Sequence, residues 1–210
     1  MIISNDDKGY PSKWSDYSNQ MKISNGSFSG LLGLGSNPGD INRFAARFRA
    51  ANCFAGLEFE GYSEETQKGY SALCQVVFTW SAFETLLKLK STQANSIGEA
   101  LRQYGSEQIL ANIKNLDVEN KFYRFIHERV NSSHQRELDN YFNDDPSNIA
   151  YLASAIRHIF AHGILTPNVQ KISPNIVVEI CRLLCEFLMT VMDEEFTLHY
   201  EQALREIRGQ

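Results

Sequence analysis

The fold is decided by residues 63–90, SEETQKGYSALCQVVFTWSAFETLLKLK. Ser63 is a helix-capping residue, and two glutamates follow it in the first turn, where the helix dipole favours acidic side chains. Apolar residues then recur every three or four positions, the spacing of one face of an amphipathic helix: Tyr70, Leu73, Val76, Val77, Trp80, Phe83, Leu86 and Leu87. The stretch therefore predicts one long helix to about Lys90, with Glu84 close to its apolar stripe.

Two more helices begin with a capping residue followed by proline, a combination that suits the first helical turn. Asp145-Pro146 opens a helix over 147–162, which Gly163 ends, and Ser173-Pro174 opens a last helix to about Ile207. Both carry apolar stripes at helical spacing: Ile149, Leu152, Ala153, Ile156, Ile159 and Phe160 in the first, and Ile176, Val177, Ile180, Leu183, Leu184, Phe187, Leu188 and Val191 in the second.

Shorter helices are expected between these long ones. Ser96-Ile-Gly-Glu99 has the capping-box pattern, and Gly105 ends the helix that it opens. Further short helices are predicted over 106–117, 119–131 and 133–142. No stretch alternates apolar and polar residues as a strand does, and no repeat of about 20–50 residues is visible. The sequence predicts an all-α fold, an up-and-down bundle of about four to six helices over residues 63–208.

Residues 1–62 are predicted to form a separate, loop-rich segment with one short helix, because they are rich in Ser, Asn, Gly and Asp. The glycine-rich run 30–39 has neither spacing of the phosphate-binding motifs and lacks the lysine of a P-loop. It therefore predicts a flexible loop.

The short helix of this segment is expected over 41–54, capped by Asp40. Arg43 and Arg47 are four residues apart and share a face of it. They form either a solvated charged face or a contact for an anionic ligand.

Composition limits the classes of protein to which the chain belongs. Of its 210 residues, 43% are hydrophobic and 21% are charged, which is typical of a globular protein of about one domain, here with an appendage. The net charge of −5 excludes a generic basic surface for duplex DNA, although a few arginines can still line one cleft. The four cysteines form no C-x-x-C pair and lie among apolar residues, so reduced thiols in the core are expected: Cys53, Cys74, Cys181 and Cys185.

The sequence predicts a cytoplasmic protein that does not cross a membrane. Its first residues, MIISNDDKGY, lack the charged and then apolar design of a secretion signal. The most apolar stretch, 176–192, is interrupted by Glu179, Arg182 and Glu186, which are too many charges for a lipid-facing span of about 20 residues.

A cluster of residue types suited to catalysis lies at the end of the helix over 147–162, in Arg157-His158-Ile-Phe-Ala-His162-Gly163. Arginine offers a planar, permanently charged fork for phosphate oxygens, and histidine can move a proton near neutral pH. Together these groups can cleave RNA without a metal ion or cofactor. One group deprotonates the 2′-hydroxyl, which attacks the adjacent phosphate, and a cation offsets the charge that builds on the oxygens.

Arg157, four intervening residues and His162, followed by glycine at a helix end, resemble the R-x4-H signature of the HEPN superfamily of α-helical RNases. His158 fits the polar residue that commonly follows the family's arginine, and the helix around Glu84 resembles the early bundle helix that carries an acidic or polar residue near it. The resemblance covers residues 63–208. It implies a metal-independent endoribonuclease with paired motifs at a dimer interface and an RNA substrate. A toxin or defence setting, with an antitoxin or nucleotidyltransferase partner, is implied in the same way.

Helix geometry adds an argument for a homodimer. At about 100° per residue, Arg157 and His162 point about 140° apart, so one chain cannot aim both at one phosphate unless the last turn unwinds at Gly163. A two-fold dimer would present two copies of the motif across one cleft. In the expected composite site, His162 is the general base or acid and Arg157 stabilises the charge of the transition state. His158 and Glu84 orient them, and the products are a 2′,3′-cyclic phosphate and a 5′-hydroxyl.

The same residues allow other interpretations. Arg157 would pair with a carboxylate such as Glu84 while His162 caps the helix end. Alternatively, His158 and His162 have the spacing of a zinc-binding pair, although the glutamate of H-E-x-x-H is missing, which excludes a zinc protease. The third ligand would come from a carboxylate or from another histidine: His127, His134 or His199. The alternative function is a non-catalytic HEPN-type module that binds RNA, a nucleotide or a protein partner.

A second candidate contact for RNA lies over residues 121–136. Its cations are Lys121, Arg124 and Arg129, with His127 and Arg136, and they interleave with the rings of Phe122, Tyr123 and Phe125. In an RNA-binding strip, the cations would contact phosphates and the rings would stack on bases. The other interpretation places the rings in the core and leaves the cations solvated.

Overall fold

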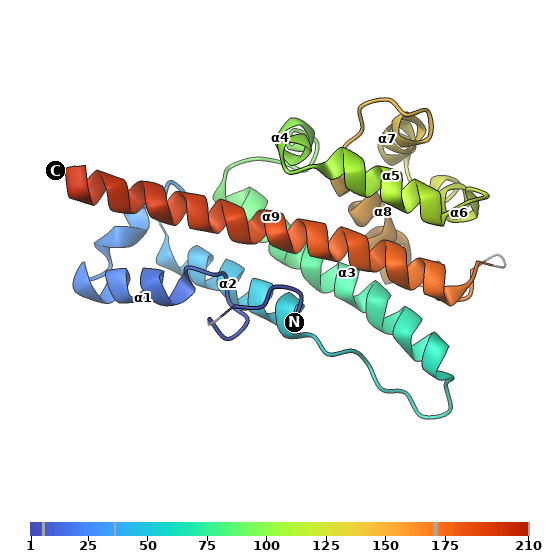
Figure 1. Cartoon of the computed structure of the whole chain (residues 1–210), viewed down its shortest axis with the longest axis horizontal. Helices are drawn as coiled ribbons and strands as arrows, with labels where there is room; N and C mark the ends of the chain where they lie inside the picture. Colours follow the sequence, from blue (N-terminus) through green and yellow to red (C-terminus); the bar gives the residue numbers. More distant parts are fainter. Residues whose placement is uncertain (6, 36, 170–171, 210) are drawn as a thin grey trace.

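The computed structural model describes residues 1–5, 7–35, 37–169 and 172–209. Within these ranges the chain forms nine α-helices and one short 3-10 helix, and no strand (Figure 1). The elements are α1 (Trp14–Ile23), η1 (Ser27–Leu31), α2 (Pro38–Cys53), α3 (Glu64–Leu89), α4 (Gly98–Gln103), α5 (Ser106–Leu116), α6 (Lys121–His127), α7 (Ser132–Phe142), α8 (Ile149–Ala161) and α9 (Pro174–Gly209). The all-α prediction is confirmed, whereas the expected count of four to six helices is too low.

Helix α9 crosses the whole length of the molecule and lies along α3 (Figure 1). Residues from the first halves of both helices line one cavity, and Lys90, just after α3, pairs with Glu195 in the second half of α9. The two helices therefore run in the same direction. Sequential neighbours in an up-and-down bundle are antiparallel. The chain departs from that topology because a long crossover, residues 90–173, carries α4 to α8 and returns to the start of α3. There Pro167 lies against Gly69.

The segment before residue 63 is packed into the same core as the rest of the chain. Tyr17, Phe28 and Phe44 are almost fully buried, and Phe196 of α9 places its ring 5.9 Å from Tyr17 and 6.1 Å from Phe44 between centroids. One hydrophobic core therefore includes residues from α1, η1, α2, α3, α8 and α9. The expectation of a loop-rich segment with one short helix misses α1 and η1, whose few apolar residues are buried by contacts with distant helices rather than along a periodic stripe.

Helix α2 begins earlier than expected. The side chain of Asn37 accepts a hydrogen bond of 2.9 Å from the Gly39 amide, and Pro38 takes the first helical position. Asn37 is therefore the cap, and Asp40 lies inside the first turn. The glycine-rich run before it is not a free loop in its described residues, because Leu32 and Leu34 are buried.

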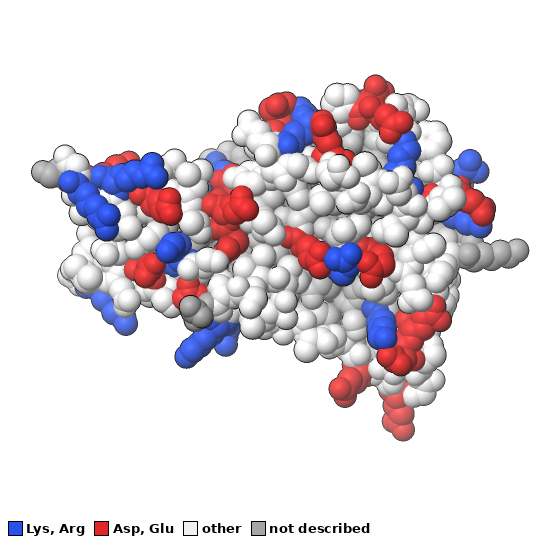
Figure 2. All heavy atoms as spheres, in the orientation of Figure 1, with Lys and Arg blue, Asp and Glu red and all other residues white. Residues whose placement is uncertain are grey.

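Charged groups are scattered over the face shown in Figure 2, where basic and acidic side chains are intermixed and no large continuous basic area is visible. In the ranges that the structure describes, no helix has both the length and the apolar character needed to cross a bilayer.

Phe28→Ala tests whether the N-terminal segment is part of this core. The ring lies within 5.7 Å of Tyr200 and 6.1 Å of Tyr17 between centroids, so its removal should lower the free energy of unfolding by about 3–5 kcal/mol. Ile23→Ala is the matched control, since Ile23 is 78% exposed and its loss should change stability by less than about 0.5 kcal/mol. Denaturant unfolding of both variants measures the difference, and equal stabilities would show that this segment does not pack as described.

Candidate functional site

Helix α8 carries the predicted cluster on a face that points away from the core. Asn148 caps its start by accepting a 3.1 Å hydrogen bond from the Ala150 amide. Its apolar face is buried and packs on α3. On the other side lies a polar stripe, defined here as the residues three or four positions apart along α8 that are exposed or half-buried: Tyr151, Ser154, His158 and His162.

Two imidazole rings meet at the end of this stripe. His158 and His162 are both exposed, and their ring centroids are 4.5 Å apart with an interplanar angle of 65°. Arg157 lies beside them on the helix and is half-buried, and within the described residues its guanidinium has no hydrogen bond or ion pair. The predicted groups are thus accessible from solvent rather than sealed in the core.

The last turn of α8 does not unwind before His162. The His162 amide donates to the His158 carbonyl at 3.2 Å, and the two following amides close a Schellman motif. In that motif, Gly163, at φ +71°, donates to Phe160, and Ile164 donates to Ile159, both at 2.9 Å. Arg157 and His162 therefore keep the divergence of about 140° that a regular helix imposes.

Glu84 does not join this cluster through any direct contact. It is half-buried on α3, and among the described residues no hydrogen bond or ion pair links it to Arg157, His158 or His162. Among these residues, the structure therefore shows no contact through which Glu84 could orient the motif and no ion pair between Glu84 and Arg157.

A third histidine, which the sequence offered only as one of three possible zinc ligands, lies against the polar stripe. His134 of α7 has its Nε2 3.2 Å from Ser154 Oγ, and its ring meets that of Tyr151 edge-on at 5.1 Å. Burial lowers the pKa of His134, and the nearby charge of His158 lowers it further. The only local signal in the sequence was its position three residues after the capping residue Asn131.

The zinc alternative finds no complete ligand set. Within the described residues, no three His, Cys, Asp or Glu side chains are grouped so that they could hold a metal ion. Two of the proposed third ligands lie elsewhere in the fold: His127 Nε2 is 2.9 Å from Asp139 Oδ1, and His199 on α9 is 3.8 Å from Glu195.

The strip over residues 121–136 is mostly built into the fold. Phe122 and Phe125 are buried, and the Tyr123 ring stacks on Phe142 at 4.8 Å, so these rings serve packing. The Arg129 guanidinium lies 3.9 Å from the Phe125 ring centroid and donates to the Phe125 carbonyl.

Its remaining cations differ in how they are held. Lys121 pairs with Glu119 at 2.8 Å, whereas Arg124 is exposed and has no ion pair among the described residues. Of the three cations predicted to bind RNA, Arg124 is therefore the one most available to a phosphate.

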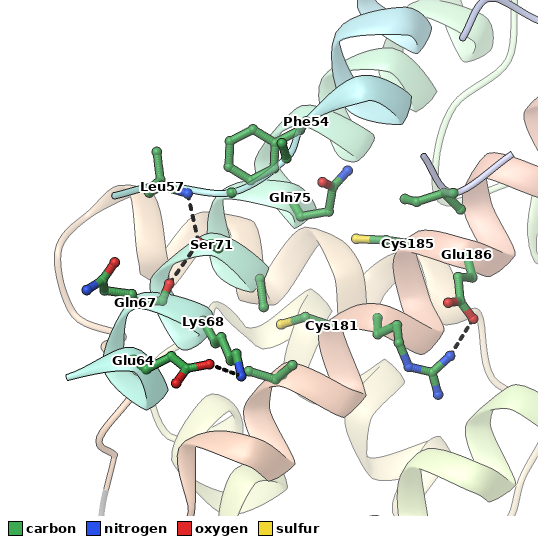
Figure 3. Close-up of a pocket in the computed structure, with 16 residues that line it drawn as sticks. Phe54, Leu57, Glu64, Gln67, Lys68, Ser71, Gln75, Cys181, Cys185 and Glu186 are labelled. Carbon is green, nitrogen blue, oxygen red and sulfur yellow. Dashed lines mark hydrogen bonds and ion pairs between the residues drawn. The ribbon is translucent and has the colours of Figure 1, made fainter. Parts of the chain in front are cut away.

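Two of the cavities that lie away from the histidines are lined by residues that the sequence singles out, cysteines in one and arginines in the other. The first, of about 400 Å³, is mostly apolar and lies between the start of α3, residues 54–57 and α9 (Figure 3). Its polar side chains already have partners within the protein, as Ser71 does with the Leu57 amide and the Gln67 carbonyl. Burial raises the pKa of Cys185 in its wall to about 12, so that this cysteine is an unreactive thiol near neutral pH.

The second cavity, of about 570 Å³, is lined by Arg43, Arg47 and Lys88. Arg43 pairs with Asp40 at 2.5 Å, and Arg47 donates to Thr85 Oγ1 at 2.6 Å. All three cations are exposed, so both interpretations of the arginine face, solvated charges and an anion contact, fit this arrangement.

Comparisons with protein families, with curated proteins and with solved structures find no match. The function of the site is therefore argued from its own geometry. Two features enter that argument: the exposed imidazole pair and the neighbouring arginine.

Acidification should destabilise the protein through two half-buried histidines. Burial lowers the pKa of both His134 and His199, so the unfolded chain takes up these protons first as the pH falls. We expect a constant melting temperature above about pH 6.5, the unfolded pKa of histidine, and a decline below it. Thermal unfolding between pH 8 and pH 5.5 measures this, with His134→Gln and His199→Gln for comparison. If the melting temperature of the variant with both substitutions falls as steeply as that of the wild type, the two histidines are not the cause of the acid destabilisation.

Proposed function

We propose that the chain is a metal-independent endoribonuclease whose active site is completed by a second copy of the same chain. The observation that carries the proposal is the pair of solvent-exposed imidazoles beside Arg157 at a capped helix end. The resemblance of this motif to the HEPN superfamily supports it. These groups supply a proton acceptor, a proton donor and a fixed positive charge, which suffice for attack of a 2′-hydroxyl on the adjacent phosphate.

The geometry within one chain favours a composite site. In an in-line displacement, the attacking and leaving oxygens lie on opposite sides of the phosphorus. Ring centroids only 4.5 Å apart place His158 and His162 on the same side of any phosphate that they contact. Arg157 diverges from His162 by about 140° as well. A two-fold partner would add a second set of these groups on the opposite side.

The roles follow from this arrangement. His162 of one copy removes the 2′-hydroxyl proton, and His162 of the second copy protonates the 5′-oxygen that leaves. Arg157 stabilises the charge on the non-bridging oxygens, since its guanidinium is not neutralised by a carboxylate among the described residues. His158 positions His162 through their edge-on ring contact. The products are a 2′,3′-cyclic phosphate and a 5′-hydroxyl.

Cleavage of mixed RNAs in the presence of a chelator tests the activity. His162→Ala and Arg157→Ala should each reduce the rate by at least about 100-fold, the size of a typical acid–base or charge-stabilising contribution. Arg205→Ala is the matched control, because Arg205 is exposed near the end of α9 and, among the described residues, its one ion pair is with Glu201. If wild-type protein binds RNA but leaves it intact, the chain is a non-catalytic binding module. If it neither binds nor cleaves RNA, an RNA function is excluded.

Mixing wild-type protein with the His162→Ala variant tests whether the site is shared. Because the composite site uses His162 of both copies, a dimer with one altered chain should be inactive. In an equal mixture only about a quarter of the dimers have two wild-type chains, so about a quarter of the rate of the same total amount of wild-type protein should remain. A remaining rate of about one half, with mixed dimers demonstrated by native mass spectrometry, would show that each chain works alone. A wild-type protein that is active as a monomer would also contradict the composite site.

A further inference from the structure

Ser154, His134 and Asn131 form a linear hydrogen-bonded chain between α8 and α7. Ser154 Oγ lies 3.2 Å from His134 Nε2, and His134 Nδ1 lies 3.0 Å from Asn131 Oδ1. A serine hydroxyl within reach of an imidazole that a third group orients is the pattern of an activated nucleophile. Asn131 and His134 lie in the same turn at the start of α7, and the packing of α7 on α8 brings Ser154, 20 positions farther along the chain, to His134.

The hydrogen bonds fix the direction of this chain. Asn131 Oδ1 accepts from the His134 amide at 3.1 Å, which identifies that atom as the oxygen because an amide nitrogen cannot accept. Because this oxygen can only accept, its hydrogen bond with Nδ1 requires the ring proton on Nδ1; the same oxygen also accepts from the Ser133 hydroxyl at 2.7 Å. The neutral ring then has its lone pair on Nε2, which accepts from the Ser154 hydroxyl. His134 is thus in the tautomer that a general base for Ser154 requires.

A small cavity lies directly over this serine. It has a volume of about 240 Å³ and is lined by Ser154, His134 and Tyr151, together with side chains from the turn after α3. Among these, Gln93 and Asn95 carry amide N–H donors of the kind that stabilises an oxyanion. The volume lies below the roughly 300–1,000 Å³ of cavities for drug-sized ligands, so it suits a short acyl group.

We propose that Ser154, His134 and Asn131 form a nucleophilic serine centre that accepts short acyl groups from ester substrates. Ser154 Oγ attacks the carbonyl carbon, and its proton moves to His134 Nε2. The carbon–oxygen bond to the alcohol breaks, and His134 returns the proton to the leaving alkoxide, which leaves an acyl group on Ser154. Water then repeats the sequence: it loses a proton to His134, attacks the acyl carbon, and the proton passes back to Ser154 as the acid is released.

The burial of His134 supports its role as the base. Desolvation and the neighbouring charge of His158 both lower its pKa, so the ring is neutral near pH 7 and can accept a proton. Asn131 also caps α7, and this capping holds its side chain in place for the ring. The serine centre does not rest on the proposed ribonuclease, because neither Arg157 nor His162 takes part in it.

Covalent labelling with a fluorophosphonate probe tests the centre directly. Native protein should be labelled at Ser154, located by peptide mass spectrometry, and should hydrolyse p-nitrophenyl acetate but not the palmitate ester. Ser154→Ala should abolish labelling, and His134→Gln should slow it by at least about 100-fold. Ser132→Ala, at an exposed position of the same α7 turn, is the matched control and should be labelled at the wild-type rate.

Substitutions of Asn131 separate an orienting role from a purely structural one. Asn131→Asp keeps both the helix cap and an acceptor for the ring proton, so labelling should persist, whereas Asn131→Ala removes both and should lose it. Circular dichroism and thermal unfolding check that each variant is folded. The proposal is overturned if urea-unfolded protein reacts as fast as native protein, if the probe attaches elsewhere, or if folded His134→Gln is labelled at the wild-type rate.

Discussion

The rest of the structure depends on the need to bury α3 on nearly every side. In the second half of α3, apolar and small polar residues face in all directions, and Trp80, Phe83, Thr85 and Leu86 are all buried. A helix that is apolar all round must be covered by other elements. The helices α2, α8 and α9 supply that cover, so α3 becomes the axis of the fold (Figure 1). Because α8 presents its apolar face to α3, its polar stripe is forced outward.

The sequence was informative where burial follows a periodic stripe. The predicted helix over 63–90 is observed as Glu64–Leu89 and is capped by Ser63 as expected. The helix predicted over 147–162 is observed as Ile149–Ala161, but Asn148 caps it and Asp145-Pro146 lies before its start. The same patterns carry no information on direction, so the parallel arrangement of α3 and α9 was not foreseen. Tyr17 and Phe28 were missed for a related reason: each is a single aromatic residue among polar ones, and only contact with α9 buries it.

The candidate site shows the same division between local and distant information. His158 and His162 were found from the sequence because a spacing of four places two side chains on one helix face. His134 was considered only as a metal ligand, since its approach to Ser154 depends on how α7 packs on α8, about 20 residues away. Conversely, Glu84 lies on the expected helix, but its position in the sequence could not show that it would make no contact with the motif.

The histidines of this chain differ in what they contribute to the fold. His199 lies beside a buried carboxylate, Glu195, which also pairs with Lys90 and accepts a 2.9 Å hydrogen bond from Tyr104. Removing one partner of such a cluster leaves a charge buried without compensation, and therefore destabilises the protein.

The imidazole pair at the end of α8 has no such structural duty. His158 and His162 are exposed, and their side chains have no hydrogen bond to the core among the described residues. The apolar face of α8 and the Gly163 turn hold the helix in place without them. Replacing these two rings should therefore alter chemistry at the helix end while leaving the fold intact. Loss of an activity in such variants can then be attributed to the missing imidazole rather than to unfolding.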